Sequence, residues 1–245
     1  MTVDADDGVG NDAVVDRKKR KAKAKAASAR PSPRQHTERV TKLESSQDAR
    51  LEGRDAGTRD RMVEGAALLL GRRGLQGTSF SEVLEATGSP RGSVYHHFPG
   101  GKDQLVKAAL DWAAAYMARA MDPSEGAPAE EITDLFLQTW RGILARSGFR
   151  SGCAMVAVTV ATESPELLEH TSAIFRAWRD RLAELLVKGG LPSREAVEFA
   201  ALLLAASEGA VVLSRGEQSM QPFDLVAAQL LKTVRGLTRK REESR

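Results

Sequence analysis

Residues 79–98 read SFSEVLEATGSPRGSVYHHF, and their pattern predicts two short helices in succession. Ser79 and Glu82 have the spacing of a capping box, in which the serine hydroxyl accepts a hydrogen bond from the Glu82 amide while the glutamate side chain reaches back. A short helix follows and ends at Gly88, and a second short helix is predicted over 91–97. Two short helices joined by a tight glycine turn predict a helix-turn-helix.

Helical periodicity extends on both sides of this stretch. Thr58 is predicted to cap a helix that ends at Gly74, and another long helix is predicted to begin near Lys102. Further helices are predicted near 129–147, 151–162, 166–188, 193–214 and 223–237. No stretch alternates between apolar and polar residues as a strand does. The sequence therefore predicts an all-α protein.

The first 57 residues differ in composition from the rest. Large apolar side chains are sparse there, whereas residues 17–42 carry 11 Lys or Arg residues and a single acid, Glu38. So few apolar groups cannot offset the entropy of ordering a chain, so we predict that residues 1–57 form a disordered basic tail. Its charge indicates a polyanionic partner.

Several other classes of protein find no support in the sequence. No apolar run reaches the roughly 18 residues of a membrane span. Acidic residues stand near the start, where a secretory signal would be basic, so we expect a cytoplasmic protein. A single cysteine, Cys153, excludes an internal disulfide framework and a multi-cysteine metal site. The His-Glu-x-x-His and Gly-x-Ser-x-Gly motifs are missing, so we expect neither an enzyme nor a bound metal or cofactor.

The second short helix has the side chains that a helix in the DNA major groove needs. Its outer face presents short or hydrogen-bonding residues: Arg91, Gly92, Ser93 and Tyr95. Val94 and Phe98 lie four residues apart on the other face and are predicted to pack inward. Hydroxyl groups or helix N-termini at Thr58, Ser79 and Lys102 are placed where DNA phosphates could be held.

Residues 58–110 resemble the DNA-binding head of the tetracycline-repressor (TetR) family. The resemblance is carried by Thr78-Ser79-Phe80, the turn over 88–93, Tyr95-His96-His97-Phe98 and the segment from Lys102 to Leu105. The spacing from Phe98 to Lys102 and the later Gly152-Cys153 are similar to the LmrA/YxaF-like branch of that family. The resemblance implies a three-helix helix-turn-helix head in front of a larger helical domain, residues 111–245, that binds an effector and dimerises.

The resemblance also implies roles for single residues. Arg91, Gly92 and Ser93 would face bases, Tyr95, His96 and His97 would contact phosphates or a thymine methyl group, and Lys102 would hold a phosphate. For Tyr95 and His97 the alternative is that they only close the small three-helix core.

Candidates for the effector pocket are large apolar side chains of the middle helices together with the thiol: Trp112, Met117, Phe136, Trp140, Cys153, Met155, Phe175 and Trp178. A mostly apolar cavity suits a small lipophilic effector. The alternative for each residue is ordinary core packing. Cys153 is either an oxidant sensor or inert filler.

Candidates for the dimer interface are Ala201, Ala205, Gly209, Leu225, Gln229 and Leu230. The small residues recur four positions apart, which permits close approach of helices and a four-helix bundle between two subunits. Packing within one subunit is the alternative. A homodimer would set two recognition helices about one DNA turn apart, as a roughly palindromic operator requires.

The leading prediction is a homodimeric, ligand-responsive transcriptional repressor that leaves its operator when the effector binds. The basic tail has three interpretations: an arm that strengthens nonspecific DNA binding, a reader of the minor groove, or a solubility extension. The alternative function is an architectural protein that uses the tail to bind DNA without sequence preference.

Overall fold

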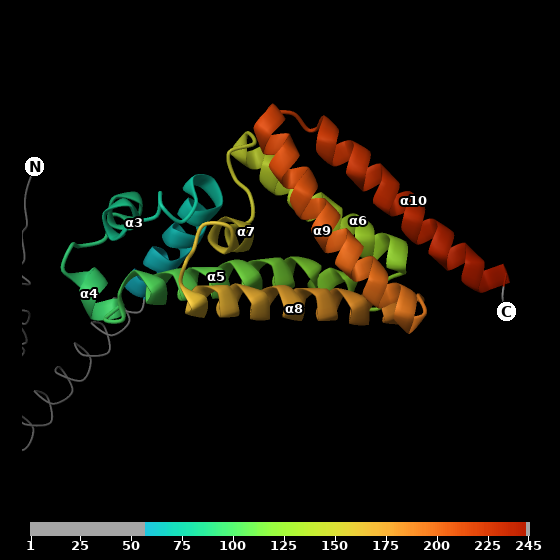
Figure 1. Ribbon diagram of the computed structural model, residues 1–245, viewed down its shortest axis with the longest axis horizontal. Coiled ribbons are helices and arrows are strands. Elements are labelled where there is room, and N and C mark those ends of the chain that lie inside the picture. Colours follow the sequence, from blue (N-terminus) through green and yellow to red (C-terminus); the bar gives the residue numbers. More distant parts are fainter. Residues whose placement is uncertain (1–56, 244–245) are drawn as a thin grey trace, which may run out of the picture. The chain divides into compact units, whose positions relative to one another are not determined.

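The computed structural model describes the backbone of residues 57–243 and the side chains of residues 57–239. The predicted tail, apart from Gly57, lies outside the described residues. Every regular element in the described part of the chain is a helix, so the all-α prediction is confirmed (Figure 1). The helices pack around one continuous apolar core.

The first described helix covers residues 57–73. Met62, Ala66 and Leu70 are fully buried on one side of it, which matches the periodicity of the sequence. The helix ends where predicted, because Gly74 adopts φ 72° and its N–H donates to the Leu70 carbonyl oxygen at 3.0 Å. The prediction that Thr58 caps the helix is wrong: the helix already includes residue 57, so Thr58 lies inside it.

The helix α3, Phe80–Thr87, begins as predicted in one half of the capping box. The Ser79 hydroxyl accepts a hydrogen bond from the Glu82 amide at 3.2 Å. The Glu82 carboxylate does not close the box, because it pairs with the guanidinium of Arg73 at the end of the preceding helix. Gly88 ends α3 at φ 62°, a left-handed conformation that glycine adopts without strain.

The helix α4, Ser93–His97, is shorter than the predicted 91–97. A turn precedes it, because the Ser93 amide and hydroxyl both donate to the Pro90 carbonyl oxygen, at 3.1 Å and 2.6 Å. Val94 and Phe98 are almost completely buried, as predicted. The guanidinium of Arg59 lies over the Phe98 ring, 5.5 Å from its centre, and adds a cation–π contact.

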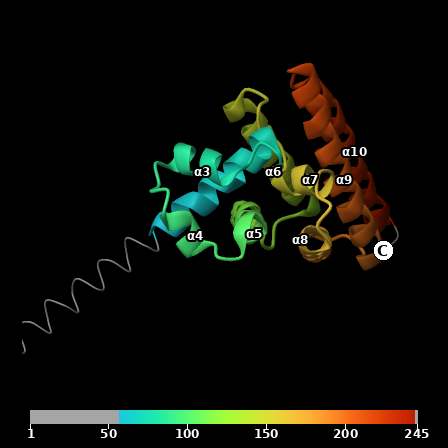
Figure 2. The ribbon, with the colours of Figure 1, turned by 60° about the vertical axis from the view of Figure 1, so that its left-hand side comes forward.

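The larger part of the chain follows α4. It consists of α5 (Gly101–Met121), the short 3-10 helix η1 (Asp122–Ser124), α6 (Ala129–Ser147), α7 (Ala154–Thr159), α8 (Pro165–Lys188), α9 (Ser193–Glu217) and α10 (Gln221–Glu243). Helices α5 and α8 pack along each other, and α9 and α10 form a hairpin that packs on α6 (Figures 1 and 2). The predicted boundaries are close for α5, α6, α8 and α9, whereas α10 runs to Glu243, beyond the predicted 237, and α7 is shorter than predicted.

Helix α7 is half as long as predicted: it ends at Thr159 rather than at 162, and it starts three residues late because residues 151–153 are held elsewhere. The Gly152 amide donates to the Gly71 carbonyl oxygen at 2.9 Å, so the segment before α7 stays extended along the first described helix. Gly71 permits this approach, since a Cβ there would lie 2.8 Å from the Gly152 carbonyl oxygen.

Helix α9 is, among the described helices, the one that is long and apolar enough to cross a membrane by length and composition. Half of its apolar window is buried inside the protein, against α6, α8 and α10. It also buries Ser207 and Glu208. These features are typical of the central helix of a core, which passes the same test of length and composition.

Candidate functional site

The outer face of α4 is exposed at one end of the described structure, next to α3 (Figure 1). Arg91, Gly92 and His96 are exposed there, and Tyr95 has 70% of its surface free. The Tyr95 ring rests edge-on against Phe80, with ring centres 5.8 Å apart. The Tyr95 ring is therefore held against α3 while most of its surface stays exposed.

Two other predicted contact residues of α4 are partly engaged within the chain. Ser93 is half-buried, and its hydroxyl donates to the Pro90 carbonyl oxygen. His97 is also half-buried and lies edge-on to the rings of His96 and Phe98. The structure thus gives His97 a position between the outer face and the small core.

The three predicted phosphate-binding residues all make contacts within the protein. The Lys102 ammonium donates to the Leu75 carbonyl oxygen at 2.8 Å and so ties α5 to the turn after the first helix. The Ser79 hydroxyl caps α3. The Thr58 hydroxyl accepts from Arg61 at 3.0 Å. Their roles toward phosphate stay predictions.

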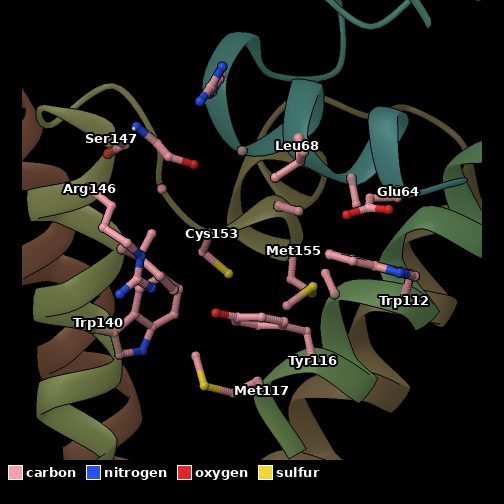
Figure 3. Close-up of a pocket in the computed structure, with 18 of the residues that line it drawn as sticks. Glu64, Leu68, Trp112, Tyr116, Met117, Trp140, Arg146, Ser147, Cys153 and Met155 are labelled. Carbon is pink, nitrogen blue, oxygen red and sulfur yellow. Dashed lines mark hydrogen bonds between the residues drawn. The ribbon is translucent and has the colours of Figure 1, made fainter. Parts of the chain in front are cut away.

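A cavity of about 340 Å³ lies between residues 57–73, α5, α6, α8 and the segment 151–155 (Figure 3). Six of the eight predicted pocket residues line it: Trp112, Met117, Trp140, Cys153, Met155 and Trp178. Trp112 and Tyr116 stack with ring centres 5.8 Å apart and an interplanar angle of 14°. Figure 3 shows Trp112, Tyr116 and Met117 on one wall, Trp140 and Arg146 on the opposite wall, and Cys153 between them.

The other two predicted pocket residues lie elsewhere. Phe136 lines a second cavity of about 400 Å³, which shares Met117 and Trp178 with the first. Phe175 lines neither of these two cavities; its ring packs edge-on against Trp178 at 6.3 Å. Phe175 is therefore a packing residue of α8 beside the site.

The first described helix also contributes to the cavity, which was not predicted from the sequence. Glu64, Leu68 and Arg72 of that helix line the cavity. Figure 3 shows Glu64 and Leu68 above it. Leu68 is 48% exposed, although it is a large apolar residue. An apolar residue outside the buried stripe of a helix was the available signal. The cavity therefore touches both the head and the larger domain.

A second junction between these two parts is formed by Arg215 near the end of α9. Its guanidinium donates to the carbonyl oxygens of Gly71 and Arg72, each at 3.2 Å, and to that of Arg150 at 3.4 Å. These oxygens include groups at the C-terminal end of the first helix, where a positive charge is favourable. Arg215 thus joins three segments far apart in the sequence.

The thiol of Cys153 is buried, and burial raises its pKa well above the ordinary value, with the nearby Glu208 carboxylate adding to the rise. A thiol in this state is a poor nucleophile, which favours the filler interpretation over the oxidant sensor. Burial also raises the pKa of Glu208 to about 7, although the neighbouring Cys153 thiol lowers it. Apart from this thiol, neither carboxylate oxygen of Glu208 has a hydrogen-bond partner among the described residues.

The predicted dimer residues lie on the outer side of the α9–α10 hairpin, with one exception. Ala201, Ala205, Gly209, Leu225 and Gln229 are exposed there. Leu230 is only 3% exposed, because α10 turns this position toward the core of its own subunit. Leu202, Val212 and Leu213 extend the exposed apolar face along α9.

No group of three or more His, Cys, Asp or Glu side chains with the arrangement of a metal site occurs in the part of the chain that the structure describes.

Comparison with known protein families finds similarity over both parts of the chain. Residues 63–109 match the bacterial regulatory proteins of the tetR family, and residues 128–229 match the C-terminal domain of LmrA/YxaF-like transcriptional regulators.

Relatives are similar over most of their length. An uncharacterized HTH-type transcriptional regulator of Mycobacterium tuberculosis is 37% identical over 181 residues, which are 71% of this chain and 92% of the relative. The HTH-type transcriptional regulator LmrA of Bacillus subtilis is 28% identical over 68% of this chain and 90% of its own. The crystal structure of a TetR transcriptional regulator from Chloroflexus aurantiacus superposes with a TM-score of 0.64 at 28% identity, covering 74% of this chain and 96% of that one.

Proposed function

Because the chain belongs to the TetR family of transcriptional regulators, with a C-terminal domain of the LmrA/YxaF-like type, we propose that it is a ligand-responsive repressor. It is a transcriptional regulator and not an enzyme. In this proposal a homodimer binds a palindromic operator in the cytoplasm and leaves it when a small, mostly apolar effector enters the cavity of about 340 Å³.

The exposed face of α4 supports the DNA-binding part of the proposal. Arg91, which has a long guanidinium side chain, and Gly92, which has no side chain, lie at the N-terminal end of α4. This is the end at which a recognition helix contacts bases. A guanidinium group can donate two hydrogen bonds to the O6 and N7 atoms of a guanine. Tyr95 and His96 then lie along the same exposed side toward the phosphates.

The position of the cavity is the observation that carries the ligand-responsive part. A molecule in the cavity would contact Leu68 of the head and Trp140 of α6 at once, so its binding would depend on how the head sits on the larger domain. A ligand shifts such an equilibrium by its difference in affinity for the two positions, and a few kcal/mol suffice.

The outer face of the α9–α10 hairpin supports a homodimer. Exposed apolar residues such as Leu202 and Leu213 stand beside the small residues Ala205 and Gly209, so a second copy could approach closely. Two subunits packed on this face would form a four-helix bundle.

Selection of genomic DNA fragments by the purified full-length protein at about 0.15 M salt tests the proposal. We expect a small number of palindromic sites, and we expect the selection to fail with Arg91→Ala while Arg119→Ala, an exposed arginine of α5 away from α4, selects the same sites. Diffuse enrichment without a common motif, retained by the Arg91 variant, would favour the architectural alternative.

A further inference from the structure

Two residues that line the cavity of about 340 Å³ carry buried hydrogen-bond donors that bond to no atom of the described residues. They are the indole nitrogens of Trp140 and Trp178, both of which are buried, and both residues line the cavity. Trp140 is only 2% exposed. Buried polar groups in proteins are as a rule hydrogen-bonded, and a bound molecule with an acceptor next to these residues would satisfy the two donors.

The charge on the same wall indicates what kind of acceptor this is. Arg146 lies beside Trp140 on the α6 wall of the cavity (Figure 3). Within the described residues no carboxylate forms an ion pair with Arg146. The acid that lines the cavity, Glu64, lies on the far side, next to Trp112. A guanidinium and an indole N–H on one wall favour an oxygen that carries negative charge.

Most of the rest of the lining is apolar, apart from Arg72, Ser147 and Ser151. Trp112 and Tyr116 stack almost parallel on the α5 wall, and Met117, Met155 and Leu68 fill the space between the walls. Such a surface accepts an aromatic or otherwise apolar body, and methionines adapt their shape to it.

We propose that the cavity binds an aromatic or apolar molecule with one anionic oxygen group, whose negative charge meets Arg146 and Trp140 and whose body packs against Trp112 and Tyr116. This inference rests on the proposed effector site and assigns its ligand a chemical class. The anionic group sets the orientation of the ligand, and the body reaches toward Leu68 of the head.

Two fluorescent probes test this assignment, because they share one arylamine body and differ in charge. They are 8-anilino-1-naphthalenesulfonate, which carries a sulfonate, and N-phenyl-1-naphthylamine, which is neutral. Fluorescence titration of the full-length protein should show that Arg146→Gln weakens binding of the sulfonate probe by about tenfold and of the neutral probe by less than about twofold. Trp140→Phe keeps the ring and removes the donor, so it should also weaken the sulfonate probe selectively.

Two further variants make the result unambiguous. Arg119→Gln removes an exposed charge of α5 that does not line the cavity, so it should change neither titration. Leu68→Trp narrows the mouth at a position that is 48% exposed and should weaken both probes. Helical circular dichroism identifies any variant that does not fold, and because Arg146 is exposed we expect Arg146→Gln to fold.

Equal loss of both probes in Arg146→Gln, or titrations of both probes unchanged by Leu68→Trp, would overturn the assignment. Operator binding is measured without either probe, so the two proposals fail separately. A protein that selects palindromic DNA yet shows no preference for the sulfonate probe would retain the proposed function and lose this inference.

Discussion

Arg91 stands at the start of the exposed face of α4, with no other described side chain pairing with it. Its substitution by alanine removes a donor pair and leaves the core untouched. We expect Arg91→Ala to lower the discrimination between operator and scrambled DNA by about 1 to 3 kcal/mol. Fluorescence anisotropy with both DNAs measures this difference. A uniform loss on both would instead assign Arg91 to a phosphate.

The carboxyl group of Glu208 is buried, and burial disfavours its charged form. Its pKa is about 7 in the folded protein against 4.5 for the free group, so the folded state binds the proton more tightly than the unfolded state. The free energy of unfolding therefore falls as the pH rises from about 4.5 through 7, by up to about 3 kcal/mol. The Cys153 thiol stays protonated over this range because its own pKa is raised.

Urea unfolding at pH 5 and pH 8 tests this statement with Glu208→Gln. The variant cannot ionise, so its stability relative to the wild type should be higher at pH 8 than at pH 5. Glu217→Gln changes an exposed acid of the same helix and should show no such difference. The same relative stability of Glu208→Gln at both pH values would mean that Glu208 titrates as an ordinary carboxyl group.

At the scale of elements, Arg215 is the contact by which α9 holds the end of the first described helix. Arg215→Gln loses charged hydrogen bonds to the Gly71 and Arg72 carbonyl oxygens, and we expect it to lower the free energy of unfolding by about 1 to 3 kcal/mol. We also expect faster hydrogen exchange of the amides in residues 71–77.

The matched control is Arg194→Gln at the other end of α9. Arg194 makes an exposed ion pair with Glu198 four residues on, and such pairs contribute about 0.5 kcal/mol or less. If the two variants cost the same stability and leave exchange in residues 71–77 unchanged, Arg215 does not hold the head.

The helices show which local signals in the sequence are sufficient to predict where a helix begins and ends. Glycine and proline mark the ends of α6 and α8 closely, because these residues act on the backbone wherever the chain goes. The limits of α7 and the second half of the capping box at Glu82 could not be predicted. Both depend on long-range partners, Gly71 and Arg73, and spacing along the chain carries no information about them.

For the molecule as a whole, the exposed apolar face of α9 and α10 predicts that two copies of the chain form a dimer. Leu213 is 53% exposed on this face, and in a symmetric dimer it occurs twice. Leu213→Glu should weaken the dimer by about 100-fold, because two charges would lose water. Sedimentation velocity measures the change. Leu168→Glu, at a 40% exposed leucine of α8, is the control and should remain dimeric.

The candidate site could be predicted only in part, because helices that are far apart in the sequence form it together. Six pocket residues followed from the size and apolarity of side chains in the middle helices. Leu68 did not, because the first helix contributes to both the head and the cavity, and this follows from how distant helices pack. Tyr116 was missed although it is an aromatic residue of the long helix predicted from Lys102. Leu230 was misplaced since the sequence does not show which side of α10 faces its own core.

The central claim is that occupation of the cavity moves the head and thereby weakens operator binding. The most direct measurement is the operator affinity of Leu68→Trp, which fills the mouth of the cavity without any ligand, compared with Leu168→Trp, which adds the same side chain outside it. We expect Leu68→Trp to bind the operator about tenfold more weakly and Leu168→Trp to bind it as the wild type does. Equal, wild-type affinity of both folded variants would contradict the claim.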